Sequence, residues 1–378
     1  MFFSENGYLP YPFFYNKNDT FMDFFNINYS ALGGDAYSRW KVFYSPLFLF
    51  LGKYITPEYC NTINDSFELR DCNLNVLFYS LLPPLLISLF VMWWKSKRGL
   101  GGDVYWWILL FLFSFPLAYG FERGNYIFYG FLFLTIYVFF ESKWYALLPL
   151  CITSKYYLIA LLLPYLRWRK KMLLCAILAL IINVALALQY GDAGWVYIPK
   201  YILNFSGGVS NWREAIYAPT SIFAFSTVLN FIPSYSVEFL FRIALFILKF
   251  TILMDFIACV SRIDCRSAER RLWVGMLALI FLEIITPAAG LYSLMLLYPF
   301  FIYFAGKNLL SEYQKILAIL LALPYPIQVG WVENQTFKNL LHEAVVVNVG
   351  LGFQTFIPLM LLIVLYWDVR KAVLNVDE

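Results

Sequence analysis

Apolar runs of membrane-spanning length recur along this chain between residues 73 and 366, and they constrain its fold more than any other feature. An upright helix needs about 20 such residues to cross a bilayer. Because lipid offers no hydrogen-bond partners, each run must satisfy its own backbone groups, which favours helices over isolated strands. Charged residues make up only 14% of the chain, against about 25% in ordinary soluble domains. The sequence therefore predicts an all-α, polytopic membrane protein.

About nine complete spans are expected. They are 73–95, 104–121, 125–140, 172–190, 237–260, 272–286, 290–305, 312–331 and 345–366. The segment 144–166 has Lys155 in its middle and basic residues at both ends, so it predicts a short helical hairpin that turns at Ser154 and Lys155. Residues 42–55 and 217–233 predict amphipathic helices that lie in the membrane interface.

Basic residues are distributed unevenly between the two sides that these spans define. If residue 72 is outside, 16 of the 28 lysines and arginines fall on the opposite side, which is then cytoplasmic. The acidic head and the loops at 191–235 and 332–344 are expected outside the cell membrane, and the C-terminus inside.

We expect one integral-membrane domain over 1–378. It divides into an outer-face loop (1–72), a transmembrane bundle (73–366) and a cytoplasmic tail (367–378). Nothing in residues 1–40 has the length of a span or the pattern of a signal peptide. Since the head is expected outside, a first helix upstream of Met1 is expected to be missing from the sequence.

Cysteine and histidine usage limits the possible chemistry. Cys60 and Cys72 flank one outer loop, where a disulfide is permitted, but their spacing leaves pairing and non-pairing equally open. The other four cysteines fall in helices or on the cytoplasmic side and are typical of packing residues. His342 is the only histidine, which excludes a histidine-based triad or a multi-histidine metal site within this chain. We expect no cofactor, no metal and no nucleic-acid partner.

The polar, aromatic head contains the first candidate site residues. Asp19 and Asp23 are four residues apart, so they share a face if this segment is helical. A carboxylate among aromatic rings at a membrane surface is partly desolvated, which suits a general base. Asp23 lies inside the apolar run FMDFF and is favoured for function, whereas Asp19 is favoured as a helix cap or a supporting residue. Tyr44 is a candidate for stacking on a substrate ring.

The turn FERGN provides a second group of candidates. Glu122 and Arg123 either pair with each other at the surface, where such a pair contributes about 0–1 kcal/mol, or Arg123 contacts a phosphate through its planar guanidinium. Asn125 starts the next span.

Lys155 is flanked by mainly apolar sequence. It is a functional candidate by default, with a lysine that snorkels to the interface as the alternative. Tyr292 follows a Pro and Gly turn and is a possible hydroxyl donor, although a tight interhelical turn accounts for Pro287 and Gly290.

The order of these motifs resembles glycosyltransferase family 87, in the C-type superfamily of integral-membrane glycosyltransferases. The matching residues are Asp23-Phe24, Tyr44-Ser45-Pro46-Leu47, Arg123-Gly124-Asn125, Lys155 and Thr286-Pro287. The resemblance spans about residues 19–300. Some members have a histidine after the later turn, where this chain reads AAGLYSL, so Tyr292 is expected to substitute or the donor phosphate to be held differently.

The resemblance implies a bacterial inner-membrane enzyme that moves a hexose, mannose or glucose, from a polyprenyl-phosphate sugar to a glycan or glycolipid acceptor on the periplasmic face. Asp23 matches the family's presumed base. Asp19, Glu122, Arg123, Asn125, Lys155, Tyr44 and Tyr292 are expected to bind the substrates. Two alternatives remain open: an O-antigen-type polysaccharide polymerase, and a transporter or flippase of lipid-linked glycans.

Overall fold

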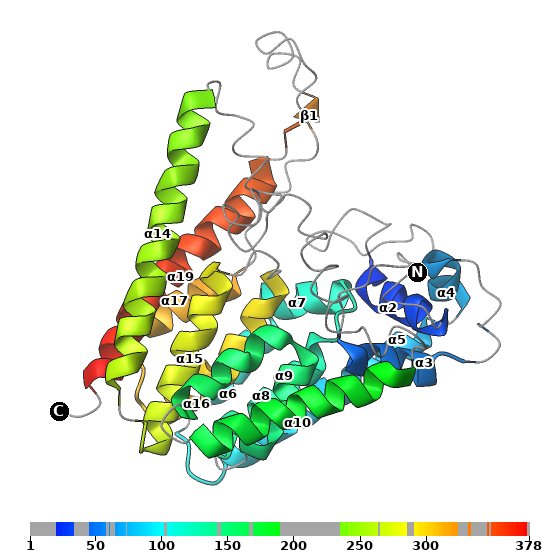
Figure 1. Cartoon of the computed structure of the whole chain (residues 1–378), viewed down its shortest axis with the longest axis horizontal. Helices are drawn as coiled ribbons and strands as arrows, with labels where there is room; N and C mark the ends of the chain where they lie inside the picture. The colour runs from blue at the N-terminus through cyan, green and yellow to red at the C-terminus, as the bar shows by residue number, and fades with distance from the viewer. Residues whose placement is uncertain are drawn as a thin grey trace.

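The computed structural model describes residues 20–33, 45–57, 60, 65–72, 74–101, 104–141, 145–165, 169–189, 235–263, 265–285, 291–323, 332–333, 346–347 and 349–375. These parts of the chain are helical apart from turns and one short antiparallel pair, in which β1 (Val332–Glu333) bonds to β2 (Val346–Val347) (Figure 1). The predicted helical class is therefore confirmed.

The helices are α2 (Met22–Leu32), α3 (Pro46–Ile55), α4 (Ser66–Cys72), α5 (Asn75–Ser96), α6 (Val104–Leu112), α7 (Phe115–Glu122), α8 (Ile127–Phe139), α9 (Leu148–Ser154), α10 (Arg169–Ala187), α14 (Tyr235–Arg262), α15 (Ala268–Ile285), α16 (Tyr298–Gly306), α17 (Glu312–Ala322) and α19 (Val349–Asn375). Three short 3₁₀ helices accompany them: η2 (Tyr145–Leu147), η3 (Tyr156–Tyr165) and η5 (Leu291–Leu297).

Three helices within the described ranges are long and apolar enough to cross a membrane: Asn75–Ser96, Val104–Glu122 and Lys170–Ala187. Each of the nine predicted spans overlaps a helix, but several of these helices are short or broken. The α8 helix, for example, has 13 residues and a length of about 20 Å, against a hydrocarbon core of about 30 Å. The described part of the chain thus does not support nine complete spans.

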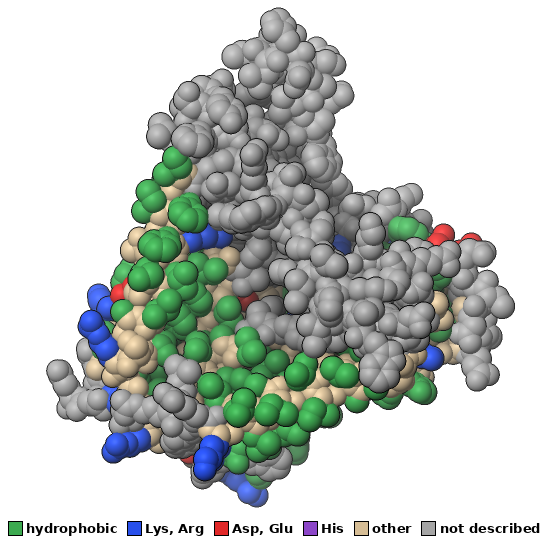
Figure 2. All heavy atoms as spheres, viewed as in Figure 1, with side chains coloured by type: hydrophobic (Ala, Val, Ile, Leu, Met, Phe, Trp, Pro, Cys, Tyr) green, Lys and Arg blue, Asp and Glu red, His purple; other side chains and the backbone are tan. Residues whose placement is uncertain are grey.

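Exposed apolar side chains cover the outer faces of the long helices. Figure 2 shows them along α10 and along α14, where Leu173, Ile181, Ile247 and Phe250 are more than half exposed. Contiguous apolar surface of this kind is rare on soluble monomers and is typical of an interaction or membrane surface. The apolar helices therefore fit a membrane protein.

Basic side chains meet at one end of the bundle. The turn after α5 bonds to the end of α16, where the Gly101 N–H donates to the carbonyl of Gly306 at 2.8 Å. The Lys307 ammonium, just beyond α16, lies 3.7 Å from the carboxylate of Glu141, which follows α8. These contacts join the turn after α5, the end of α8 and the end of α16. Figure 2 shows lysine and arginine side chains along this edge. We call this end of the bundle the basic rim.

The predicted hairpin at 144–166 is confirmed. The α9 helix ends at Ser154, Lys155 has an extended backbone, and η3 begins at Tyr156. The rings of Tyr145 and Tyr165 lie 6.3 Å apart, so the two ends of the segment meet. Lys155 therefore lies in the turn of the hairpin, at the opposite end from Tyr145 and Tyr165.

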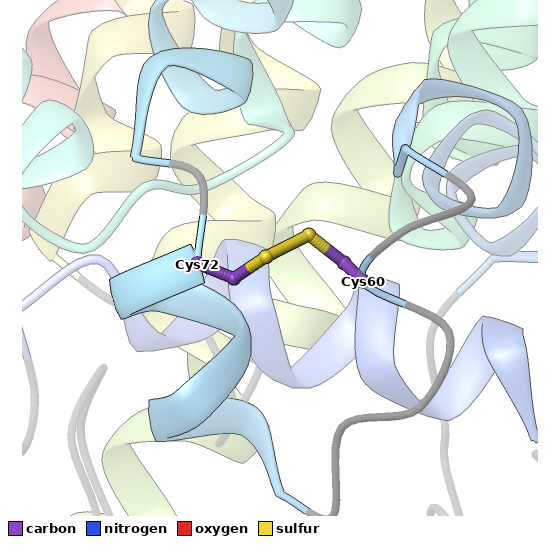
Figure 3. Close-up of a disulfide and its surroundings, with 2 residues drawn as sticks. All are labelled: Cys60 and Cys72. Carbon is purple, nitrogen blue, oxygen red and sulfur yellow. A yellow bond between two sulfur atoms is a disulfide. The ribbon is translucent and has the colours of Figure 1, made fainter.

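A disulfide joins Cys60 to Cys72, the last residue of α4 (Figure 3). This settles the alternative that spacing left open. The bonded loop also contacts the residues just before α2, because Arg70 Nη1 donates to the carbonyl of Thr20 at 3.4 Å. The segments α2, α3 and α4 lie together beside the start of α5 (Figure 1).

We expect replacement of both cysteines, Cys60→Ser with Cys72→Ser, to lower the thermal midpoint of unfolding. The cross-link closes a loop with a sequence separation of 12, for which the chain-entropy estimate is about 3 kcal/mol. Thermal unfolding in detergent, with and without a reductant, measures the effect. A reductant should shift the midpoint of the wild type and leave the double variant unchanged. Equal midpoints for the oxidised wild type and the variant would contradict the prediction.

Candidate functional site: a charged cluster opposite the basic rim

The turn between α7 and α8 presents two polar side chains. The α7 helix ends in a Schellman motif, in which the Asn125 N–H donates to the carbonyl of Gly120 at 3.0 Å and the Gly124 N–H to that of Phe121 at 2.9 Å. Gly124 has φ of +65°, the left-handed conformation that this motif requires and glycine adopts most easily. The motif reverses the chain and places Arg123 and Asn125 on either side of Gly124.

The α2 helix docks against this turn through its backbone. The Phe21 N–H donates to the carbonyl of Glu122 at 2.7 Å, and the Asp23 N–H donates to the carbonyl of Arg123 at 3.0 Å. A helix start has N–H groups without intrahelical partners, and a helix end has carbonyls in the same condition. Here the start of α2 and the end of α7 satisfy each other. Asp23 is therefore positioned by main-chain bonds to residues 100 positions later.

The Asp23 carboxylate uses both oxygens in this junction. Arg123 Nη2 donates to Oδ1 at 2.5 Å, and Asn125 Nδ2 donates to Oδ2 at 2.7 Å. Asp23 is 8% exposed, so the contact with Arg123 is a largely buried, charge-assisted bond. Asn125 Oδ1 accepts from the Ile127 N–H at 3.0 Å, which turns the amide NH₂ towards the carboxylate.

Aromatic packing makes the junction rigid. The Tyr126 ring lies between the rings of Phe24 and Phe48, with centroids 5.1 and 5.0 Å away and nearly parallel planes. Its hydroxyl donates to Asn28 Oδ1 at 2.7 Å. Because Phe24 and Asn28 belong to α2 and Phe48 to α3, one tyrosine joins both helices to the start of α8.

Glu122 is fully buried, which excludes the first of the two alternatives, a surface pair with Arg123. The Thr20 hydroxyl donates to Glu122 Oε1 at 3.2 Å. Arg123 forms its ion pair with Asp23 and not with Glu122. The motif FERGN alone does not predict this arrangement, because the partners of Glu122 and Arg123 lie about 100 positions earlier in the chain.

Lys155 approaches the cluster from the hairpin. Its Nζ lies 5.8 Å from the centroid of the Tyr292 ring, a cation–π contact. It also interacts electrostatically with the carboxylates of Asp23 and Glu283. Among the residues that the structure describes, none forms a hydrogen bond or an ion pair with this ammonium. A half-buried cation with two carboxylates nearby, and no direct partner within the described ranges, can receive an anion.

Tyr292 connects the hairpin to α7. Its ring lies 5.6 Å from that of Tyr119, and a Cβ added at Gly120 would lie 3.4 Å from the Tyr292 Cβ. The α7 helix thus packs closely on η5 just before the turn that carries Arg123. The structure places Tyr292, which the sequence predicted as a hydroxyl donor, beside Lys155.

The Tyr-Ser-Pro segment has a structural role at its serine. Ser45 caps α3, where its Oγ accepts from the Leu47 N–H at 3.2 Å, and Pro46 begins the helix. The Ser45 hydroxyl also donates to the carbonyl of Thr153, which joins α3 to the end of α9. The predicted site residues Asp19 and Tyr44, and the Thr286-Pro287 turn, lie outside the described residues.

Glu283 is the site residue that sequence reasoning missed. It is 3% exposed near the end of α15, and the Ser293 hydroxyl donates to its Oε2 at 2.6 Å. The signal was present, because an acid within the apolar run LIFLEII is costly in a membrane helix and marks a candidate site. Within the described ranges, no group of three or more His, Cys, Asp and Glu residues could hold a metal ion.

The described parts of the chain form a helical protein with three helices long and apolar enough to cross a membrane, and with a buried cluster of carboxylates and cations at one end of its bundle. Comparison with family models, curated proteins and solved structures finds no match to this chain. The function proposed below therefore rests on the geometry of this cluster.

Proposed function

We propose that this protein is an inverting membrane glycosyltransferase that moves a hexose from a polyprenyl-phosphate sugar to a glycan or glycolipid acceptor. The observation that carries the proposal is the buried carboxylate of Asp23, held by Arg123 at 2.5 Å and Asn125 at 2.7 Å, with the Lys155 ammonium close by. A general base beside two cations suits a reaction in which a hydroxyl attacks and a phosphate leaves.

In the proposed reaction, the acceptor oxygen attacks the anomeric carbon of the donor sugar. The acceptor O–H bond breaks and its proton passes to the Asp23 carboxylate. The bond between the anomeric carbon and the phosphate oxygen breaks through an oxocarbenium-like transition state, and the electron pair remains on the departing polyprenyl phosphate. One displacement inverts the anomeric configuration.

The cations have separate tasks in this proposal. The Arg123 guanidinium presents several donors in one plane, so it can exchange part of its contact with Asp23 for the donor phosphate. The Lys155 ammonium stabilises the charge that develops on the leaving phosphate. The contact between Arg123 and Asp23 before substrate arrives keeps both side chains oriented.

The proposed location is a bacterial inner membrane, with the site on the periplasmic face and mannose or glucose as the sugar. Two observations support this side. The charged cluster and the basic rim involve opposite ends of α5 and α8, and basic residues gather on the cytoplasmic side of membrane proteins. The disulfide that fastens α4 beside α2 belongs in an oxidising compartment.

Transfer from a panel of polyprenyl-phosphate sugars by purified protein in lipid nanodiscs tests the proposal. We expect transfer from at least one hexose donor, detected as radiolabelled glycan or glycolipid product with the inverted linkage. Nucleotide sugars in place of the lipid donor should give no product. Transfer of whole preassembled repeat units would favour the polymerase alternative, and movement of the lipid-linked glycan across a bilayer without bond formation would favour the transporter.

A further inference from the structure

The basic rim takes no part in the proposed reaction, although it gathers cations at the end of an apolar helix. The α5 helix is long and apolar enough to cross a membrane, and it ends at Ser96. Lys95 lies in its last turn, and Lys97 and Arg98 directly follow the helix. Lys97 and Arg98 are exposed, and neither forms an ion pair with a residue that the structure describes. Both charges can therefore receive an anion from outside the protein.

Aromatic rings hold these two cations in place. The Lys97 Nζ lies 4.4 Å from the centroid of the Trp93 ring, and the Arg98 Cζ lies 4.4 Å from the centroid of the Trp94 ring. A cation–π contact orients a long side chain and leaves its charge in place. Lys97 and Arg98 are thus oriented before any ligand arrives.

Lys95 and Lys307 extend the positive charge to neighbouring helix ends. The Lys95 Nζ lies 4.1 Å from the centroid of the Phe140 ring, just after α8. The Lys307 Nζ, just after α16, lies 3.7 Å from the carboxylate of Glu141. Because Phe140 and Glu141 are adjacent, the two lysines flank one short segment. The main-chain bond from the turn after α5 to the end of α16 keeps these helix ends together.

Exposed aromatic rings precede the cations on α5. Phe90 is 58% exposed and Trp93 is 42% exposed, and their rings lie 5.9 Å apart. Aromatic side chains are enriched where a membrane helix leaves the hydrocarbon core, and cations follow at the level of the headgroups. A ligand that fits both parts has an apolar chain and an anionic group. Anionic phospholipids have this chemistry, and basic pockets at helix ends bind their headgroups.

We propose that the basic rim is a binding site for an anionic phospholipid, with its phosphate at Lys97 and Arg98 and an acyl chain along α5 beside Phe90 and Trp93. The ammonium and the planar guanidinium both donate to phosphate oxygens. Because the rings already orient these side chains, less conformational entropy is lost when the phosphate binds. The inference does not depend on the proposed sugar transfer, since the charged cluster lies at the other end of α5 and α8.

Native mass spectrometry of the full chain in detergent, titrated with dioleoyl-phosphatidylglycerol, tests the inference. We expect the wild type to bind this lipid about tenfold more tightly than dioleoyl-phosphatidylcholine, which has the same chains and no net charge. Lys97→Gln with Arg98→Gln should raise the Kd for the anionic lipid about thirtyfold, the factor expected from two cations near a lipid surface. Excess inorganic phosphate should not displace the lipid, because it cannot use the apolar face of α5.

Arg262→Gln with Lys371→Gln is the matched control. Both residues are exposed cations near the ends of α14 and α19, and neither has an ion pair or a ring contact within the described ranges. The control removes the same charge, and its Kd should stay within about threefold of the wild-type value. Trp94→Leu should raise the Kd about threefold with every charge retained, because Arg98 loses the ring that orients it.

Glu141→Gln tests the direction of the effect. The substitution removes the carboxylate paired with Lys307, so the Kd for the anionic lipid should fall about threefold. Damage to the fold would weaken binding, so a gain in affinity cannot come from that source. If the variant without Lys97 and Arg98 gives too little folded protein, the opposite shifts of Trp94→Leu and Glu141→Gln decide the question.

Several results would overturn the inference. Equal affinity of the wild type for the two lipids would show that the rim does not select an anionic headgroup. An equal rise in Kd for the rim variant and the matched control would show general attraction to charge and no defined site. Displacement of the lipid by inorganic phosphate would show a site for free anions instead of a phospholipid.

Discussion

Asp23→Asn should lower the rate of sugar transfer by about 10²- to 10⁴-fold, the contribution of a general base, while the protein still inserts and folds. Asparagine keeps the shape of the side chain, and the two main-chain bonds that dock α2 against the end of α7 do not involve it. It cannot accept the acceptor proton at neutral pH. Initial rates with saturating donor and acceptor, measured over at least four decades, give the loss in kcat.

Asp255 offers a matched control for this substitution. Its carboxylate pairs with Arg370 Nε at 2.7 Å and accepts from the Tyr366 hydroxyl at 2.9 Å, so it too binds an arginine and a neutral donor on one distant segment, α19. Asp255→Asn should lower stability as much as Asp23→Asn and leave kcat within about twofold. Full activity of Asp23→Asn would show that another group takes the proton, and the mechanism would be wrong.

Gly124→Ala should destabilise the protein and separate the halves of the site. An added Cβ would lie 2.9 Å from Leu77 Cδ1, 2.9 Å from Phe24 Cβ and 3.1 Å from the carbonyl oxygen of Phe21. The last of these is backbone and cannot rotate away. The left-handed conformation at φ +65° adds its own cost for alanine. We expect a combined loss of about 2–4 kcal/mol and a clear drop in the thermal midpoint.

The control for the steric part of this effect is Gly99, which also has a positive φ (+138°) but has no heavy atom within 4 Å of an added Cβ. Gly99→Ala should show only the conformational cost, with transfer activity retained. Gly124→Ala should also lower activity in the fraction that remains folded, because α2 and the Arg123 turn move apart. Equal midpoints for the two variants would exclude the proposed clash.

Local sequence patterns predicted the helical class and the break at Lys155 because both depend on short-range physics. Apolar runs must be helical in lipid, and a lysine inside the run at 144–166 interrupts it. The number of spans could not be predicted in the same way. The expected span 290–305, for instance, is divided between the 3₁₀ helix η5 (Leu291–Leu297) and the α-helix α16 (Tyr298–Gly306). Composition alone does not show where one apolar run contains two helices.

The candidate site was only partly predictable for a related reason. Asp23, Arg123 and Lys155 were each predicted as site residues because they are charged residues in apolar or aromatic surroundings. That Asp23 pairs with Arg123 follows from the docking of α2 on α7, a contact across 100 residues that no spacing rule contains. Glu283 shows the reverse, since its apolar neighbours in the run LIFLEII are enough to mark it as a candidate from the sequence.

The main-chain bonds at the α2–α7 junction have a consequence for how this site can change. Phe21 and Asp23 are attached to Glu122 and Arg123 through amide and carbonyl groups that every residue except proline supplies. These main-chain bonds thus fix where the backbone of position 23 lies. The side chain at this position determines which chemical group is presented to the proposed substrate. Such a site can exchange its reactive group, by mutation or by design, without rebuilding its surroundings. A cysteine or glutamate at position 23 would report on the proposed reaction from the place that the aspartate now occupies.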